Sequence, residues 1–168
     1  LRWGTAGVRG TAHIVVEAAF RKEGIRATFV PFTGGSEAIT ALLGGHIEAS
    51  VSTDYGPQLA AGNLRLIALT GNEKLSSQPQ LPTFKELGYP LTADAYYGLF
   101  GPAKLPASIV SYWDSAIKDM MKSDEFATVM KTVGASPVYM DSATFTAYHT
   151  ESHKRFGDAI DTLGFKNK

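Results

Sequence analysis

The chain contains no cysteine, which excludes disulfide bridges, thiolate metal ligands and cysteine nucleophiles. It also has no net charge, because 16 basic residues balance 16 acidic ones. Nucleic-acid and anionic-membrane binders carry a basic surplus, so neither function is expected. No apolar run approaches the roughly 20 residues that cross a bilayer. What is present, 44% hydrophobic and 19% charged residues over 168 positions, is sufficient for a globular core.

The first hundred residues alternate short apolar runs with amphipathic stretches, which predicts an α/β fold. Short apolar runs favour a mostly parallel sheet that helices cover on both faces. Strands are predicted over residues 1–4, 27–31, 48–52, 64–70 and 96–100. Helices are predicted over residues 11–23, 36–43 with Ser36 as N-cap, and 56–61.

Beyond Pro106 the alternation stops and the sequence becomes rich in helices. Apolar residues recur at helical spacing over residues 109–120, and a shorter helix is expected around residues 126–130. A brief strand over residues 136–140 precedes a last helix, which Asp141 or Ser142 caps and Gly164 ends. The change of pattern places a domain boundary near residues 92–105.

Two glycine-rich turns are the main candidates for a binding site: TAGVRGTAH at residues 5–13 and PFTGGSEAI at residues 31–39. Each leaves a strand and enters a helix, where free backbone N–H groups and the helix dipole suit a carboxylate or phosphate. Glycines that only make tight turns are the alternative. Neither turn is a dinucleotide fingerprint or a Walker motif, so nucleotide binding is not expected.

Three side chains near these turns could contact a ligand directly. Arg9 could hold a carboxylate in bidentate fashion, or it could pair at the surface with Glu37 or Asp54. His13 could donate a hydrogen bond to a ligand, although capping or packing is the more common role at such a position. The STDY segment at residues 52–55 offers two hydroxyls and an acid at the end of a strand, or an Asx-type turn that caps the next helix.

The sequence contains no recognisable motif for catalysis or for metal binding. His46, His149 and His153 have no acidic partner at metal-ligand spacing. There is no G-x-S-x-G nucleophile elbow, and no pair of carboxylates stands out. The sequence therefore predicts neither an enzyme nor a cofactor.

Five segments, in this order and spacing, carry a family resemblance. They are TAH at residues 11–13, VPFTGGSEAITALLGG at 30–45, AGNLRLIALTG at 61–71, LPTFKELGYP at 81–90 and YYGLFGPAKLP at 96–106. Together they resemble the extracytoplasmic solute receptors of tripartite tricarboxylate transporters, the Bug or TctC-like family.

The resemblance implies a type II periplasmic-binding-protein fold whose two lobes close on a ligand. Residues 1–95 would form the second, ligand-binding lobe. Residues 96–168 would return to the first lobe, whose N-terminal part we expect to be missing, since the chain starts abruptly with no signal peptide. The implied function is a periplasmic receptor that captures a small carboxylate (a di- or tricarboxylate, an aromatic acid or an amino acid) for membrane permease subunits. The effector-binding domain of a transcription regulator is the alternative.

The resemblance also implies the ligand-binding residues. They are Gly7, Val8, Arg9, Gly10, Thr11 and His13 in the first turn, Thr33, Gly34, Gly35 and Ser36 in the second, and Ser52, Thr53 and Asp54 in the loop that follows. The family usually has glycine and then serine or threonine where this chain has Arg9 and Gly10, which suggests a more anionic or differently shaped ligand. Many members have aspartate at the position of Ser52, and Asp54 is expected to substitute for it.

Overall fold

A computed structural model describes residues 1–89, 91–133 and 135–165. Its sheet consists of three parallel strands in the order β2-β1-β3. The strands are β1 (Arg2–Ala6), β2 (Thr28–Phe32) and β3 (Ala49–Val51). The central strand β1 pairs with β2 from Arg2↔Thr28 and with β3 from Trp3↔Ala49. The first three strands predicted from the sequence, and their parallel arrangement, are confirmed.

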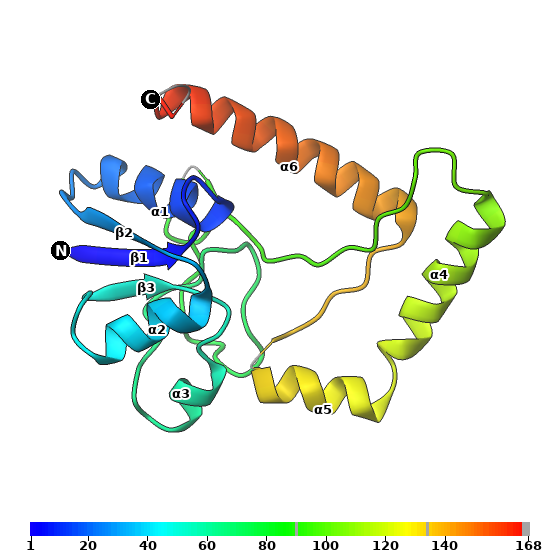
Figure 1. The fold of residues 1–168 in the computed structure, drawn as a ribbon, viewed down its shortest axis with the longest axis horizontal. Helices are drawn as coiled ribbons and strands as arrows, with labels where there is room; N and C mark the ends of the chain where they lie inside the picture. Colours follow the sequence, from blue (N-terminus) through cyan, green and yellow to red (C-terminus); the bar gives the residue numbers. More distant parts are fainter. Residues whose placement is uncertain (90, 134, 166–168) are drawn as a thin grey trace.

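Helices cover both faces of this sheet. They are α1 (Thr11–Lys22), which connects β1 to β2, α2 (Gly35–Leu43), which connects β2 to β3, and the short α3 (Gly56–Ala60) after β3. The first connection moves to one side of β1 and the second returns past it, so right-handed crossovers put α1 and α2 on opposite faces. Figure 1 shows α1 above the strands and α2 below them.

The core of this unit lies between β1 and α1. Trp3 is 1% exposed, and Val15 of α1 is fully buried. The indole of Trp3 packs edge-on against Phe20 of α1, with 5.6 Å between the ring centroids, and it also contacts Phe29 of β2. Burying each large apolar side chain contributes about 1.5–3 kcal/mol. This packing fixes α1 on the sheet and so positions the turn between β1 and α1.

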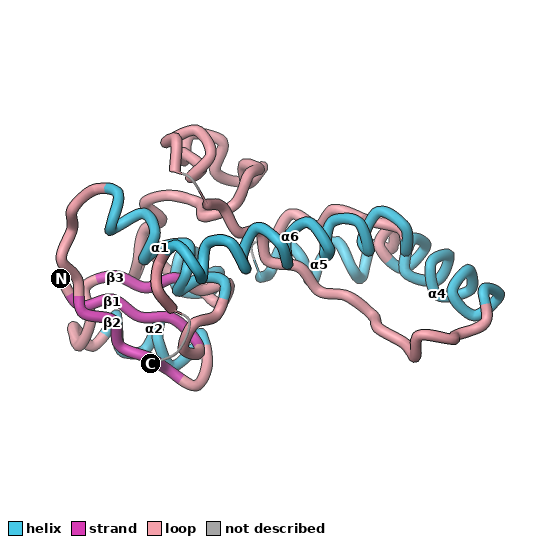
Figure 2. The backbone as a smooth tube through the Cα atoms, turned by 90° about the horizontal axis from the view of Figure 1, so that it is seen from above, coloured by secondary structure: helices cyan, strands magenta, loops and turns pink. Residues whose placement is uncertain are grey.

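The described residues of the second half form three helices, which are α4 (Ala107–Met120), α5 (Asp124–Val133) and α6 (Ser142–Thr162). The C-terminal part of α6 packs on α1, where Phe156 and Ile160 contact the cluster around Ile14. Figures 1 and 2 show α6 running from the neighbourhood of α4 back to the sheet. Oδ1 of Asp141 accepts a hydrogen bond from Thr144 N–H at 2.8 Å, which confirms Asp141 as the N-cap of α6.

Much of the apolar surface of this second half is exposed. No residue of α4 is buried, and Trp113 and Ile109 are 46% and 41% exposed. In the segment that leads to α4, Tyr97 is 90% exposed and Phe100 is 68% exposed. Ile109 and Trp113 lie four residues apart on one side of α4, and an exposed apolar helix face is typical of a surface that another part of a protein covers.

Three predicted strands are wrong. The described residues 64–70, 96–100 and 136–140 contain no strand, and Leu69 forms only an isolated bridge with Thr83. The 96–100 segment instead packs against α6, where the rings of Tyr96 and Phe100 each lie 5.7 Å from that of Phe145. Strand preference reflects packing on neighbouring strands, and in the described chain these apolar runs have helices and loops as neighbours.

Candidate ligand-binding site

Three loops meet at one edge of the sheet, because parallel strands all end at the same edge. They are residues 7–10 after β1, 33–34 after β2 and 52–55 after β3. The strand arrows in Figure 1 point toward this edge. All of the predicted site residues lie in these loops or in the first turn of the helix that follows.

The first loop has left-handed backbone at two positions, Gly7 with φ 74° and Arg9 with φ 59°. Glycine adopts such angles freely, whereas a residue with a side chain is disfavoured there by roughly 1–2 kcal/mol. The N–H of Gly7 donates to the carbonyl of Phe32 in β2 at 2.8 Å. The N–H of Arg9 donates to Nδ1 of His13 at 3.0 Å. Internal hydrogen bonds therefore hold both ends of this loop.

His13 itself is part of the core. It is 7% exposed, and its ring stacks on that of Phe29 with 3.7 Å between centroids and an angle of 14°. Burial lowers the pKa of His13, Glu17 acts against this shift, and Arg9 adds to it. Because Nδ1 accepts a hydrogen bond, the proton of the neutral ring lies on Nε2. Direct donation from His13 to a ligand stays a prediction.

The second loop is bonded to carboxylates of the protein itself. Oε2 of Glu37 accepts hydrogen bonds from the N–H and the hydroxyl of Thr33, at 2.9 and 2.8 Å. These bonds lower the pKa of Glu37. The hydroxyl of Ser36 donates to Oδ2 of Asp54 at 3.0 Å. Donors that the sequence assigns to a ligand thus have internal acceptors.

The predicted N-cap of α2 needs correction. The helix begins at Gly35 with Gly34 as its N-cap, whereas Ser36 lies inside the first turn and its hydroxyl bonds to the β3 loop instead of to helix amides. Close packing explains the glycine. A Cβ atom on Gly35 would lie 2.7 Å from Oδ2 of Asp54 and would also overlap Oγ of Ser52. The second and third loops are therefore in direct contact.

The third loop makes its own local turn. The N–H of Asp54 donates to Oγ of Ser52 at 3.0 Å, and the hydroxyl of Thr53 donates to Oδ1 of Asp54 at 3.3 Å. No side chain caps α3, so this turn is not the helix cap that the sequence left open as an alternative. It serves instead to present Asp54 to α2.

The charge along this edge is consequently uneven. The first loop carries Arg9, whereas the start of α2 carries Glu37 and is bonded to Asp54 of the third loop. A carboxylate that approaches α2 meets two like charges within a few ångströms, and repulsion at such a distance is about 1–4 kcal/mol at the effective dielectric constants of protein surfaces and water. The first loop is therefore the more favourable place for an anion.

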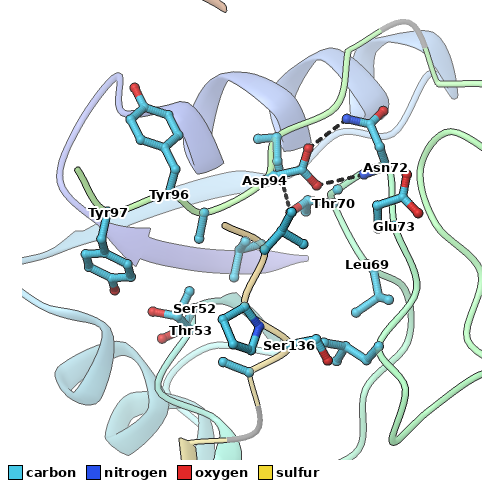
Figure 3. Close-up of a pocket in the computed structure, with 18 of the residues that line it drawn as sticks. Ser52, Thr53, Leu69, Thr70, Asn72, Glu73, Asp94, Tyr96, Tyr97 and Ser136 are labelled. Carbon is cyan, nitrogen blue, oxygen red and sulfur yellow. Dashed lines mark hydrogen bonds between the residues drawn. The ribbon is translucent and has the colours of Figure 1, made fainter. Parts of the chain in front are cut away.

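A wide cleft opens between the sheet edge and the second half of the chain (Figure 3). Of the predicted site residues, Ser36 and residues 52–54 line it, whereas residues 7–13 and 33–35 do not. Sequence reasoning missed several polar residues of this cleft, among them Thr70, Asn72, Asp94, Tyr96, Tyr97 and Ser136. The only available signal was Asp94, the one charged residue between Glu86 and Lys104.

One wall of the cleft is a polar link between two chain segments. The N–H and the side-chain amide of Asn72 donate to the two carboxylate oxygens of Asp94, at 2.8 and 2.7 Å. The hydroxyl of Thr70 donates to the carbonyl of Ala93 at 3.1 Å. Figure 3 shows Asp94 between Asn72 and Thr70. These bonds fix the chain where it leaves the sheet unit toward α4.

Within the described ranges, no group of three or more histidine, cysteine, aspartate or glutamate side chains is arranged to hold a metal ion. None of the helices described there is long and apolar enough to cross a membrane.

Loops at the carboxyl edge of a parallel sheet, with helix N-termini behind them, are the usual place for a ligand in an open α/β domain. The model of the tripartite tricarboxylate transporter family receptor (TctC) matches residues 1–165, and the chain belongs to this family. The family resemblance and the predicted fold class are thereby confirmed.

Three similar proteins illustrate the match. The UPF0065 protein in the gbd 5' region of Cupriavidus necator is 30% identical over 165 residues, which cover 98% of this chain and 50% of the relative. The solved structure of R. palustris Rpa4515 with adipate has a TM-score of 0.79 at 22% identity, over 98% of this chain and 56% of that one. MatC from Rhodopseudomonas palustris with bound malate has a TM-score of 0.72 at 21% identity, over 97% and 56%. The chain spans about half the length of the first curated relatives it matches.

Proposed function

We propose that the intact protein is a periplasmic receptor that binds a small carboxylate and delivers it to the permease subunits of a tripartite tricarboxylate transporter. Membership of the receptor family supports this function and this location. Two proteins of the same fold are solved with adipate and with malate, both of them dicarboxylates. The observation that carries the proposal is the first loop, where Arg9 lies next to the N-terminus of α1.

Physical chemistry favours an anion at this place. The helical ladder of α1 starts with the hydrogen bond from Ile14 N–H to the carbonyl of Gly10 at 3.0 Å, so the amides before Ile14 precede the ladder. With the helix dipole, such a terminus stabilises an anion by about 0.3–1 kcal/mol, and a hydrogen bond to a charged group adds about 1.5–3 kcal/mol. We assign one ligand carboxylate to Arg9, Gly10 and Thr11.

The second and third loops would contribute differently under this proposal. A carboxylate at Thr33 or Ser36 must compete with Glu37 or Asp54 for the same donors. We therefore assign these loops to the remainder of the ligand, with Ser52, Thr53 and the second turn as polar contacts of lesser weight.

Binding without turnover is part of the proposal. Receptors of this family bind and release a solute, and a receptor needs only preorganised contacts and closure. The family assignment also favours the receptor over the effector domain of a transcription regulator.

We further propose that residues 1–95 form one lobe of the receptor and that residues 96–168 return to the other lobe. The exposed apolar face of α4, with Trp113 and Ile109, supports this division, because it suits a surface that packs within a larger lobe. The double length of the relatives supports it as well.

A thermal-shift series on the intact protein tests the receptor function. Adipate, malate, a monocarboxylate and a tricarboxylate would be compared with adipamide, the uncharged diamide of adipate. A ligand at 100 times its dissociation constant adds about 2.7 kcal/mol to the stability of the folded state, so a true cargo raises the melting temperature by several degrees. Failure of every carboxylate to stabilise a folded sample more than the diamide does would contradict the proposal.

A further inference from the structure

We infer that His13 is a positioning residue, whose Nδ1 atom holds the peptide of Arg9 in the left-handed conformation from which the first loop meets its ligand. The hydrogen bond from Arg9 N–H to Nδ1, 3.0 Å long, is a geometric feature of the chain. Only its effect on affinity rests on the proposed function.

The left-handed conformation of Arg9 requires a stabilising contact. Arg9 has φ 59°, an angle that a residue with a side chain adopts only when its surroundings enforce it. The loop's other end is already fixed, because Gly7 N–H donates to the carbonyl of Phe32 at 2.8 Å. The bond from Arg9 N–H to Nδ1 of His13 fixes the peptide at this position, and its loss would remove a direct restraint on the orientation of the Arg9 amide.

The ring of His13 is fixed in the core and can therefore restrain the first loop. Its ring is stacked on Phe29 of β2 at 3.7 Å and lies edge-on to Trp3 of β1 at 5.6 Å. With 7% of its surface exposed, it has little freedom to follow a moving loop. A fixed acceptor lowers the ordering cost that the loop would otherwise meet when a ligand binds.

The hydrogen bond from Arg9 N–H to His13 requires the neutral imidazole ring. A proton on Nδ1 would turn the acceptor into a donor that faces the N–H of Arg9, so the hydrogen bond would be lost. The groups placed around the ring are Arg9 and Glu17, which are charged, and Trp3, Phe29 and Phe165, which are not. Acid is therefore expected to loosen the first loop.

Long-range ¹⁵N NMR of the wild-type intact protein tests the hold without any ligand. We expect the neutral ring of His13 to carry its proton on Nε2, and the Arg9 amide signal to shift together with the ring as His13 titrates at a pH below the ordinary histidine value. A proton on Nδ1, or an Arg9 amide that ignores the titration, would overturn the inference.

Two variants test the effect on binding, with adipate and malate as probes. In His13→Asn the amide oxygen can take the place of Nδ1, whereas in His13→Gln it reaches toward the position of Nε2. Loss of one hydrogen bond predicts about tenfold weaker binding in His13→Gln than in His13→Asn. The affinity of the wild type divided by that of His13→Asn should also decrease as the pH is lowered. Dividing the two affinities cancels the effect of the ligand's own titration.

The outcomes are separable. Equal affinities of the two variants, or a pH-independent ratio, would refute the positioning role. If neither probe nor any other carboxylate binds the wild type, the proposed function fails, and the NMR experiment still decides whether His13 holds Arg9.

Discussion

Replacing Arg9 by glycine and by alanine separates its backbone strain from its charge. Glycine removes both, whereas alanine removes only the charge. The left-handed angle of 59° disfavours a residue with a side chain by roughly 1–2 kcal/mol. A glycine avoids this strain, but it makes the unfolded chain more flexible, which costs about 0.5–1 kcal/mol of stability. On balance, Arg9→Gly should be more stable than Arg9→Ala by about 0.5–1 kcal/mol. Other contacts of the arginine side chain cancel in this comparison.

Urea unfolding of the intact protein measures this difference, as a higher midpoint at an unchanged slope. An alanine variant as stable as the glycine variant would refute the left-handed conformation of Arg9. Both variants should bind carboxylates at least about tenfold more weakly than the wild type, because both lack the guanidinium and its charge-assisted hydrogen bonds. If the glycine variant binds as the wild type does, Arg9 is not the anchor.

Three further predictions concern other parts of the chain. Asn72→Ala removes the side-chain amide, whose N–H donates to Asp94 and whose oxygen accepts from the hydroxyl of Thr92, and should cost about 1–3 kcal/mol in urea unfolding. The backbone N–H of residue 72 still donates to Asp94 in this variant. Gly35→Ala pushes a methyl group into the β3 loop and should destabilise by about 1–3 kcal/mol by the same assay. The bonds from Thr144 lower the pKa of Asp141. The cap thus stabilises α6 above the ordinary carboxyl pKa and is lost as pH falls through the lower folded value. The melting temperature should therefore fall more on acidification in the wild type than in Asp141→Ala, which keeps only the acid dependence of the other carboxylates.

The sheet and its helices follow from local patterns. A buried strand needs an apolar run of the right length, as around Trp3, and a crossover helix needs apolar residues at helical spacing, as around Ile14. The cap at Asp141 depends on the three residues that follow it, so it too could be predicted. Local patterns do not predict whether an apolar run finds a neighbouring strand. The apolar run at residues 64–70 reads as a strand, but the described chain offers it no neighbouring strand.

The contacts within the site are less predictable, because they depend on strand order. Ser36 and Asp54 are 18 residues apart and meet because α2 passes β1 to reach β3. A pattern of residues predicts that both lie at the same edge of the sheet. It does not predict that one will be the hydrogen-bond partner of the other. The structure brings the polar residues of the two loops together through the bond between Ser36 and Asp54, and their contact with a ligand stays a prediction.

Arg9 shows most clearly what a sequence alone conceals. The sequence predicts a charged anchor at this position, and the residue pattern carries no sign of the backbone angle there. The structure adds that this position has φ 59°, an angle that glycine adopts freely and that strains a residue with a side chain. An arginine there must therefore offset its strain, and the hydrogen bond to His13 is a contact that does so. The bond to the buried ring of His13 therefore lets a charged side chain occupy a backbone position that glycine would adopt without strain.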